Sequence, residues 1–461
     1  MIEHDIIKSE TYKYLIILNR QFIALPKDSF PCSGATQLWS LLYNLINKIL
    51  ERIDRYSTRQ LRLITTTLLP EIDELCKQLN NSVTSKVPWS LLPSLESVFS
   101  TIRKDAKFII TPQWKTNYSV FNKNIIKHLI DLVFSIPDLV FDSGASFEKE
   151  KEAFFLDVSE EIYMLHYPRS ERLTPLHFPL LGHEIGHIFA AEWIQGYYQK
   201  KLDKYDLENK IDLYIKGNLP PGIKGQLFEP QYIITMKSNI FNTFKRIAEE
   251  TIADCVGGII FGPAALLSSF VFCLNFGYDD FDALKFGYLP WRYRLYLLSE
   301  VLISIGTLNF QYDSKGARQW IKDILQITNG YDYMSNLRQL THESYCRFIF
   351  EIFMNEIKTI GGELIGLIPK PHYADVGNAT LQEEVVRRLS NGVIPNCTIS
   401  NNLAETPIDF RNIIAGTWLY LCKQNLSETV EFNKISKRAN LLSLKAIELS
   451  HMQQKVINGD D

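Results

Sequence analysis

The sequence predicts an α+β protein in which α-helix predominates. Apolar residues recur at helical spacing near both ends of the chain, for example in "TQLWSLLYNLINKILERI" and "YCRFIFEIFMNEIKTI". Short runs rich in β-branched and aromatic residues, "KFIITPQWKTNYSVF" and "AFFLDVSEEIYMLHYP", lie between these helical segments. A chain of 461 residues is also long enough for two or three domains with a large buried core.

Three regions are expected along the chain. Residues 1–140 form a helical N-terminal region, residues 141–309 a central α+β domain, and residues 310–461 a helical C-terminal region. The first boundary follows from the turn-like stretch "IPDLVFDSGASFEKEKE". Before it, "KFIITPQWKTNYSVF" predicts a short hairpin. After it, "AFFLDVSEEIYMLHYP" predicts one or two strands, in which His166 would be an ordinary strand residue or line an edge strand open to an extended peptide.

A helix is expected to begin between two prolines in the central region. Pro175 and Pro179 bracket its start, because proline is tolerated in the first turn of a helix but not in its interior. The mainly apolar run from Leu180 through Trp193 forms the body of this helix.

A long uncharged run follows further along the chain. From Cys255 to Tyr278 there is no charged residue for 24 positions, which is long enough to span a bilayer. We favour a buried helix broken near Gly262-Pro263, because glycines and polar residues dilute the run and no basic cluster flanks it. Membrane association of residues 255–278 is left open.

Composition narrows the function classes. The net charge is -3, from 49 basic and 52 acidic residues, so the chain lacks the basic excess of a nucleic-acid-binding protein. Its seven cysteines are scattered and never form C-x-x-C, which is typical of reduced thiols in the cytoplasm. The N-terminus has no signal-peptide pattern. We therefore expect a cytoplasmic protein that does not bind nucleic acid.

The segment "LGHEIGHIF" carries the strongest chemical signal. His183 and His187 are four residues apart, so on a helix they share one face and can present two imidazole nitrogens to one ion. Zinc accepts such nitrogens, and a catalytic zinc keeps a position for water beside three protein ligands. Glu184 can reach that water without binding the metal and would serve as the general base.

Chance alone rarely produces this pattern in such a context. H-E-x-x-H arises by accident in on the order of one chain in a hundred of this length. Here it falls inside a helix-like segment that follows predicted strands. Gly186, which costs a helix stability, is more easily explained where a ligand or another chain segment comes close.

A third ligand is expected downstream. Ala190 and Trp193 stand where the metzincin pattern requires glycine and a third histidine. Instead, "KRIAEETIADCVGG" places Glu250 and Asp254 four residues apart, which resembles the E-x-x-x-D element of the gluzincin zinc metallopeptidases. This resemblance implies that Glu250 is the third zinc ligand and that Asp254 orients a zinc-binding histidine.

The resemblance covers only the two motif helices, and alternatives remain. The separation of 63 residues from His187 to Glu250 (250 minus 187) is longer than in thermolysin-like enzymes and nearer that in the gluzincin branch containing the heat-shock and prenyl-protein membrane proteases. Glu249 is the main competitor for the third ligand and Glu192 a more distant one. Glu249 and Glu250 could also simply pair with basic residues at the surface. Asp254 argues for a buried site, because an acid beside a long uncharged run is costly unless it is paired.

Zinc peptidases usually add a donor for the oxyanion that forms during the reaction. Sequence spacing cannot choose among the candidates, which are Tyr288, Arg292, Tyr293, Arg294, His342, His372 and Tyr373.

Together these features predict a zinc metallohydrolase with one Zn²⁺ per chain and a gluzincin-like core between helical flanks. The expected activity is that of a metalloendopeptidase acting on a protein or peptide, with water activated by zinc and Glu184. Two other readings stay open: a catalytically silent sensor or scaffold that acts through its helical flanks, and a zinc hydrolase for another kind of amide.

Overall fold

The structure is a computed structural model. It describes residues 2–121, 124–140, 161–202, 207–274, 288–307, 348, 363–364, 366–370, 372–399, 405–424 and 429–459. Contacts within the chain divide it into two compact units, Met1–Leu173 and Thr174–Asp461. This division separates the strand segment near residue 165 from the helix with the histidine pair. The three-region division expected from the sequence stays a prediction, because much of residues 308–362 lies outside the described part.

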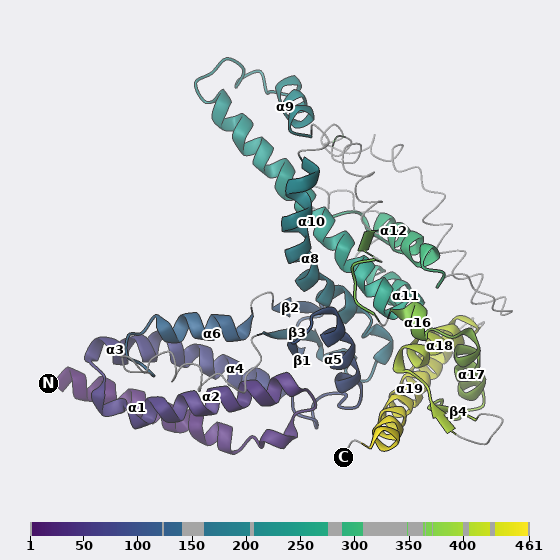
Figure 1. Ribbon diagram of the computed structural model, residues 1–461, viewed down its shortest axis with the longest axis horizontal. Helices are drawn as coiled ribbons and strands as arrows, with labels where there is room; N and C mark the ends of the chain where they lie inside the picture. Colours follow the sequence, from purple (N-terminus) through teal and green to yellow (C-terminus); the bar gives the residue numbers. More distant parts are fainter. Residues whose placement is uncertain are drawn as a thin grey trace. The chain divides into compact units, whose positions relative to one another are not determined.

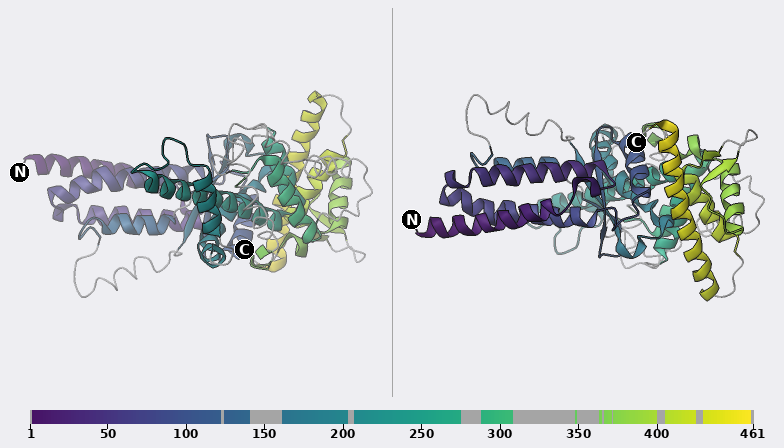
Figure 2. Two further views of the ribbon diagram at one scale, coloured as in Figure 1. Left: turned by 90° about the horizontal axis from the view of Figure 1, so that it is seen from above. Right: turned by 90° about the horizontal axis from the view of Figure 1, so that it is seen from below.

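The first unit is built mainly from helices that run alongside one another (Figures 1 and 2). They are α1 (Ile2–Ile23), α2 (Ser33–Glu51), α3 (Thr58–Leu63), α4 (Leu69–Asn81), α5 (Leu91–Ile102) and α6 (Ile125–Phe134), with short turns η1 (Lys27–Ser29), η2 (Ile53–Arg55), η3 (Ile64–Leu68) and η4 (Arg169–Glu171). Helix α2 explains the packing: Leu38, Leu42, Leu45 and Ile49 recur at helical spacing and are fully or almost fully buried.

A small three-stranded sheet packs against these helices. Its strands are β1 (Lys107–Gln113), β2 (Ser119–Phe121) and β3 (Ile162–Pro168), in the order β1-β3-β2. β1 runs parallel to β3, and β2 runs antiparallel to it.

This order corrects two sequence expectations. β1 and β2 do not pair as a hairpin, because β3 lies between them. For the same reason His166 is on the central strand, where it pairs with Thr111 on one side and Ser119 on the other. It therefore does not line an edge open to a peptide.

The second unit is also mainly helical and carries the histidine pair. Its elements are η5 (Pro175–His177), α8 (Leu180–Leu202), α9 (Leu207–Gly217), α10 (Glu229–Phe261), α11 (Pro263–Cys273), α12 (Trp291–Ser304), α16 (Tyr373–Val376), α17 (Ala379–Ser390), β4 (Cys397–Ile399), β5 (Glu405–Pro407), α18 (Phe410–Cys422) and α19 (Thr429–Asn458). β4 and β5 form an antiparallel pair. The described chain is thus mostly helical with few strands, as the sequence predicts.

Helices α8 and α10 lie side by side and make the most extensive helix contact among the described residues of the second unit (Figure 1). Small residues allow this approach. A Cβ atom added to Gly186 would stand 2.5 Å from Ala253 Cα, and one added to Gly182 would stand 3.1 Å from Gly257 Cα. Gly186 is therefore explained by the close approach of another segment of the chain, which is one of the two reasons the sequence suggested.

Residues 255–273 of the uncharged run form the end of α10 and the whole of α11, and residues 275–278 lie outside the described part of the chain. α10 ends at Phe261, Gly262 takes a positive φ of 58°, and α11 begins at Pro263. Residues 255–270 and Cys273 are buried, and Val271 and Phe272 are half-buried. The break expected at Gly262-Pro263 is thus confirmed. Among the described residues, the structure contains no helix that is long and apolar enough to cross a membrane.

Candidate metal centre

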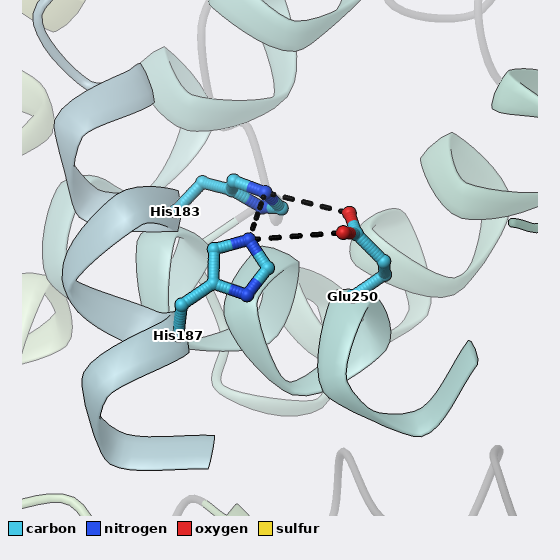
Figure 3. A group of neighbouring side chains, drawn as sticks. All are labelled: His183, His187 and Glu250. Atoms are coloured by element: carbon cyan, nitrogen blue, oxygen red, sulfur yellow. Dashed lines mark hydrogen bonds and ion pairs between the residues drawn. The ribbon is translucent and has the colours of Figure 1, made fainter. Parts of the chain in front are cut away.

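Helix α8 places the two histidines of the motif on one face. It begins at Leu180, directly after Pro179, as the sequence predicts. His183 and His187 therefore stand one turn apart, and their Nε2 atoms are 3.0 Å from each other (Figure 3). The rings are nearly perpendicular, with centroids 4.6 Å apart. Two imidazole nitrogens thus converge on one point.

Glu250 reaches the same point from α10. Its Oε2 atom is 3.5 Å from His183 Nε2, and its Oε1 atom is 3.7 Å from His187 Nε2 (Figure 3). One ligand atom from each of the three residues lies within 4.8 Å of the others. In the described part of the chain this is the one group of histidine, cysteine or acidic side chains that could hold a metal ion. All three side chains are largely buried.

A second carboxylate stands behind each histidine. Asp254 Oδ1 is 2.8 Å from His183 Nδ1, and Glu249 Oε1 is 3.3 Å from His187 Nδ1. The distances are those of charge pairs, although neither Nδ1 atom is aligned for a good hydrogen bond. Burial alone would lower the pKa of His187, but contact with Glu249 and the nearby Glu250 charge raise it. Each ring therefore directs Nδ1 to an acid and Nε2 toward the shared point.

Arg294, from α12, joins the two acids of α10. Its Nε and Nη2 atoms donate to Asp254 Oδ2 and Oδ1 at 2.7 and 2.8 Å, and Nη2 also lies 3.1 Å from Glu250 Oε2. Burial would raise the pKa of Asp254, but the Arg294 charge and His183 hold it well below its usual range. Asp254 is therefore ionised. Its pairing with Arg294 explains how an acid can be buried at the start of an uncharged run.

Glu184 is a buried acid next to His183. It is 8% exposed, and within the described part of the chain its carboxylate makes no hydrogen bond or ion pair. Its charge nevertheless acts on His187 and contributes to the raised pKa of that ring. A buried carboxylate is costly unless something compensates for it. Among the described residues, Glu184 is thus the acid of this cluster whose carboxylate no other side chain engages.

The chemistry of the donor set fits a zinc ion. Where Nδ1 of both histidines faces a carboxylate, neutral rings carry their protons on Nδ1. Two Nε2 lone pairs then face each other at 3.0 Å beside the Glu250 carboxylate. These acceptors repel one another unless a cation stands among them; a single proton joins only two of them, whereas a divalent metal can bind all three. Two imidazoles and one carboxylate form a known catalytic zinc ligand set with a position left for water.

The competing third ligands are separated by the fold. Glu249 lies at His187 Nδ1, on the other side of the ring from Glu250. Glu192 is on α8, but its side chain lies outside the described residues. Among the described side chains, Glu250 is therefore the acid that meets both Nε2 atoms.

The oxyanion candidates are not all brought to the site. Arg292 and Tyr293 lie in the first turn of α12, two residues and one residue before Arg294. His372 is engaged elsewhere: its Nε2 atom contacts Ile368 O at 2.7 Å and its side chain caps α16. Tyr373 is also in α16. His342 lies outside the described residues, and Tyr288 is half-exposed just before α12.

Two roles were missed from the sequence. Glu249 was considered as a metal ligand but not as the acid behind His187, and Arg294 was considered as an oxyanion donor but not as the partner of Asp254. The cost of burying Asp254 did signal a missing cation. Nothing in the spacing identified it, because Arg294 is 40 residues away on another helix.

Comparison of the chain with protein-family models, curated protein sequences and solved structures finds no match.

Proposed function

We propose that this protein is a zinc-dependent peptidase whose site is formed by α8 and α10. The observation that carries the proposal is that His183, His187 and Glu250 converge beside Glu184, a buried acid with no partner among the described residues. A purely structural zinc site is usually closed by four protein ligands. Three ligands with a free carboxylate beside them favour a site that handles water.

Each residue has a distinct role in this proposal. His183, His187 and Glu250 hold the ion, which when bound supplies Lewis-acid chemistry to water and to the substrate carbonyl. Glu184 accepts a proton from the attacking water and returns it to the departing nitrogen. Asp254 and Glu249 keep the two rings oriented.

The proposal includes a gluzincin-like arrangement of the two motif helices. Its support is the H-E-x-x-H segment on α8 together with Glu250 and Asp254 one turn apart on α10. For the oxyanion, His372 is the poorer candidate, because its side chain is already bonded to backbone, and Arg292 and Tyr293 of α12 stay candidates. The substrate is proposed to be a protein or peptide, and the cytoplasm is the proposed location.

Zinc content and cleavage test the proposal together. Wild type purified without added metal should contain about one zinc per chain. His183→Ala and Glu250→Ala should lose it, and His451→Ala, which removes a partly buried histidine from α19, should keep it. Glu184→Gln should keep its zinc and cut a peptide library at least ~100-fold more slowly than wild type.

The outcomes separate the readings. A wild type that holds no zinc and takes up none when it is supplied would overturn the proposal. Full zinc occupancy with no cleavage of any peptide would instead indicate a sensor or scaffold. Cleavage that survives Glu184→Gln would show that another group is the base.

A further inference from the structure

Arg294 is placed where it contacts both the third candidate ligand and the acid behind His183. Its guanidinium binds both oxygens of Asp254 and also reaches Glu250 Oε2 at 3.1 Å. The side chain is 7% exposed, and its charged carbon lies 4.2 Å from the centre of the Trp291 ring. One cation is thus held on three sides by groups of α10 and α12.

We propose that Arg294 is a positioning residue for the metal ligands: its guanidinium fixes Glu250 and Asp254 in a single arrangement before a metal binds. This inference rests on the zinc site proposed above and adds a residue to it. It concerns how the ligands are held and involves no contact between Arg294 and the substrate.

The fork of the guanidinium explains why an arginine suits this position. A planar group with several donors can bind the two oxygens of one carboxylate and still reach a second carboxylate. A lysine ammonium is a single point charge and cannot hold both acids in a fixed orientation. Stacking on Trp291 restricts the plane of the guanidinium further.

Arg294 also distinguishes the two oxygens of Glu250. Nη2 lies 3.1 Å from Oε2, whereas Oε1 faces His187 Nε2 at 3.7 Å. Glu250 is thereby prevented from turning freely. Without Arg294, the carboxylates of Glu250 and Asp254 would repel each other, and both would be free to rotate away from the histidines.

A positive charge near a metal site also repels the metal, so the two effects must be weighed. The Arg294 charge is already matched by two carboxylates at 2.7 to 3.1 Å, which leaves little net charge to act on a cation. Ligand orientation should therefore dominate. Residues that support metal ligands from behind typically contribute 10- to 100-fold to metal affinity.

The test compares the zinc affinity of three variants with that of wild type, by competition with a chromophoric chelator at neutral pH. Arg294→Met removes the fork and keeps much of the volume. Arg294→Lys keeps the charge without the fork. Arg411→Met is the matched control, because Arg411 is a buried arginine on α18 that pairs with Asp409, the residue before that helix, whereas the ligands lie on α8 and α10.

We expect Arg294→Met to bind zinc about 10- to 100-fold more weakly than wild type and Arg294→Lys to recover only part of the loss. Arg411→Met should stay within about twofold of wild type. The visible absorption of Co²⁺-loaded protein reports the ligand geometry directly and should change in Arg294→Met but not in Arg411→Met. Circular dichroism checks that each variant is folded. If Arg294→Met does not fold, Arg294→Lys takes its place as the test variant.

Unchanged or tighter zinc binding by a folded Arg294→Met would overturn the inference, and so would full recovery by lysine or an equal loss in Arg411→Met. None of these results contradicts the proposed function, provided that wild type binds zinc. If wild type binds none, it is the proposed function that fails.

Discussion

His183 and Asp254 form a buried pair across two helices, with Nδ1 and Oδ1 2.8 Å apart. The pair lies on the side of the ring opposite Nε2, which faces Glu250. Asp254 therefore fixes which nitrogen of His183 is available to an ion without approaching that ion itself. Arg294 donates to both oxygens of Asp254, so the acid serves the histidine and the arginine at once.

Asp254→Asn should weaken zinc binding and destabilise the fold. Asparagine keeps the shape of the side chain but not its charge, so His183 loses its acid and Arg294 a buried partner. We expect zinc affinity to fall about 10- to 100-fold and the free energy of unfolding to fall by about 3 kcal/mol or more, the usual cost of breaking a buried ion pair. Chelator competition and denaturant titration measure the two effects.

The control for this prediction is Asp409→Asn, which disturbs the pair with Arg411 and the start of α18. It should lower stability and leave zinc affinity unchanged. Equal zinc affinity in Asp254→Asn and wild type would show that Asp254 has no part in holding His183.

Glu249→Gln should have a smaller effect on zinc binding than Asp254→Asn. Glu249 is more exposed, with 28% of its side chain accessible, and stands farther from its histidine, at 3.3 Å from His187 Nδ1. Glutamine also keeps an acceptor oxygen for the Nδ1 proton. We expect a loss of less than about tenfold, the low end of such contributions. A larger loss than in Asp254→Asn would reverse the order of importance that the geometry gives.

Gly186→Ala should destabilise the second unit. The new Cβ would stand 2.5 Å from Ala253 Cα and 2.8 Å from its carbonyl oxygen, so the backbone of α8 or α10 must move. Overpacking of this kind costs about 1–3 kcal/mol, against a gain of about 1 kcal/mol from the better helix propensity of alanine. The net effect should be a lower melting temperature and weaker zinc binding, because the ligands of the two helices separate.

Gly196→Ala is the matched control on the same helix. A Cβ at Gly196 would meet nothing within 4 Å, so the variant should be as stable as wild type or slightly more stable. Equal melting temperatures for Gly186→Ala and wild type would mean that the two helices can separate at no cost.

His166 should make the first unit sensitive to acid. Burial and the charge of Lys115 lower its pKa to about 4, and within the described chain its buried Nδ1 has no hydrogen-bond partner. In the unfolded chain the ordinary pKa is about 6.5. Between these values the unfolded state binds a proton that the native state does not, so stability is complete above pH ~6.5 and falls as the pH drops toward 4.

The loss from His166 alone should be about 2 kcal/mol at pH 5. Denaturant unfolding of wild type and His166→Gln at pH 7 and pH 5 isolates it, because acid effects from other groups are common to both proteins. The difference between the two pH values should be smaller in the variant by this amount. An identical difference in both proteins would mean that His166 is protonated in the native state.

Local patterns in the sequence predicted several features of this structure correctly. The spacing of His183 and His187 placed both on one helix face, and the proline and glycine positions located the start of α8 and the break at Gly262. These features depend on residues near one another in the chain, where helix geometry and backbone preferences decide the outcome.

Features that depend on contacts between residues far apart in the sequence were not predicted. The insertion of β3 between β1 and β2 joins segments about 50 residues apart, and the β-branched and aromatic residues of "KFIITPQWKTNYSVF" predicted a hairpin instead. The pairing of Arg294 with Asp254 is of the same kind. The spacing of residues along the chain does not show which helices pack against each other. Such pairs are therefore known only from the folded structure.

The close crossing of α8 and α10 also has a kinetic consequence. The histidines stand on one helix and Glu250 on the other. The two backbones pack directly against each other where Gly186 meets Ala253. Any separation of the two helices would therefore draw Glu250 away from the histidines and weaken the hold on a bound ion. The rate at which the ion exchanges would then rise with the frequency at which the helix pair opens.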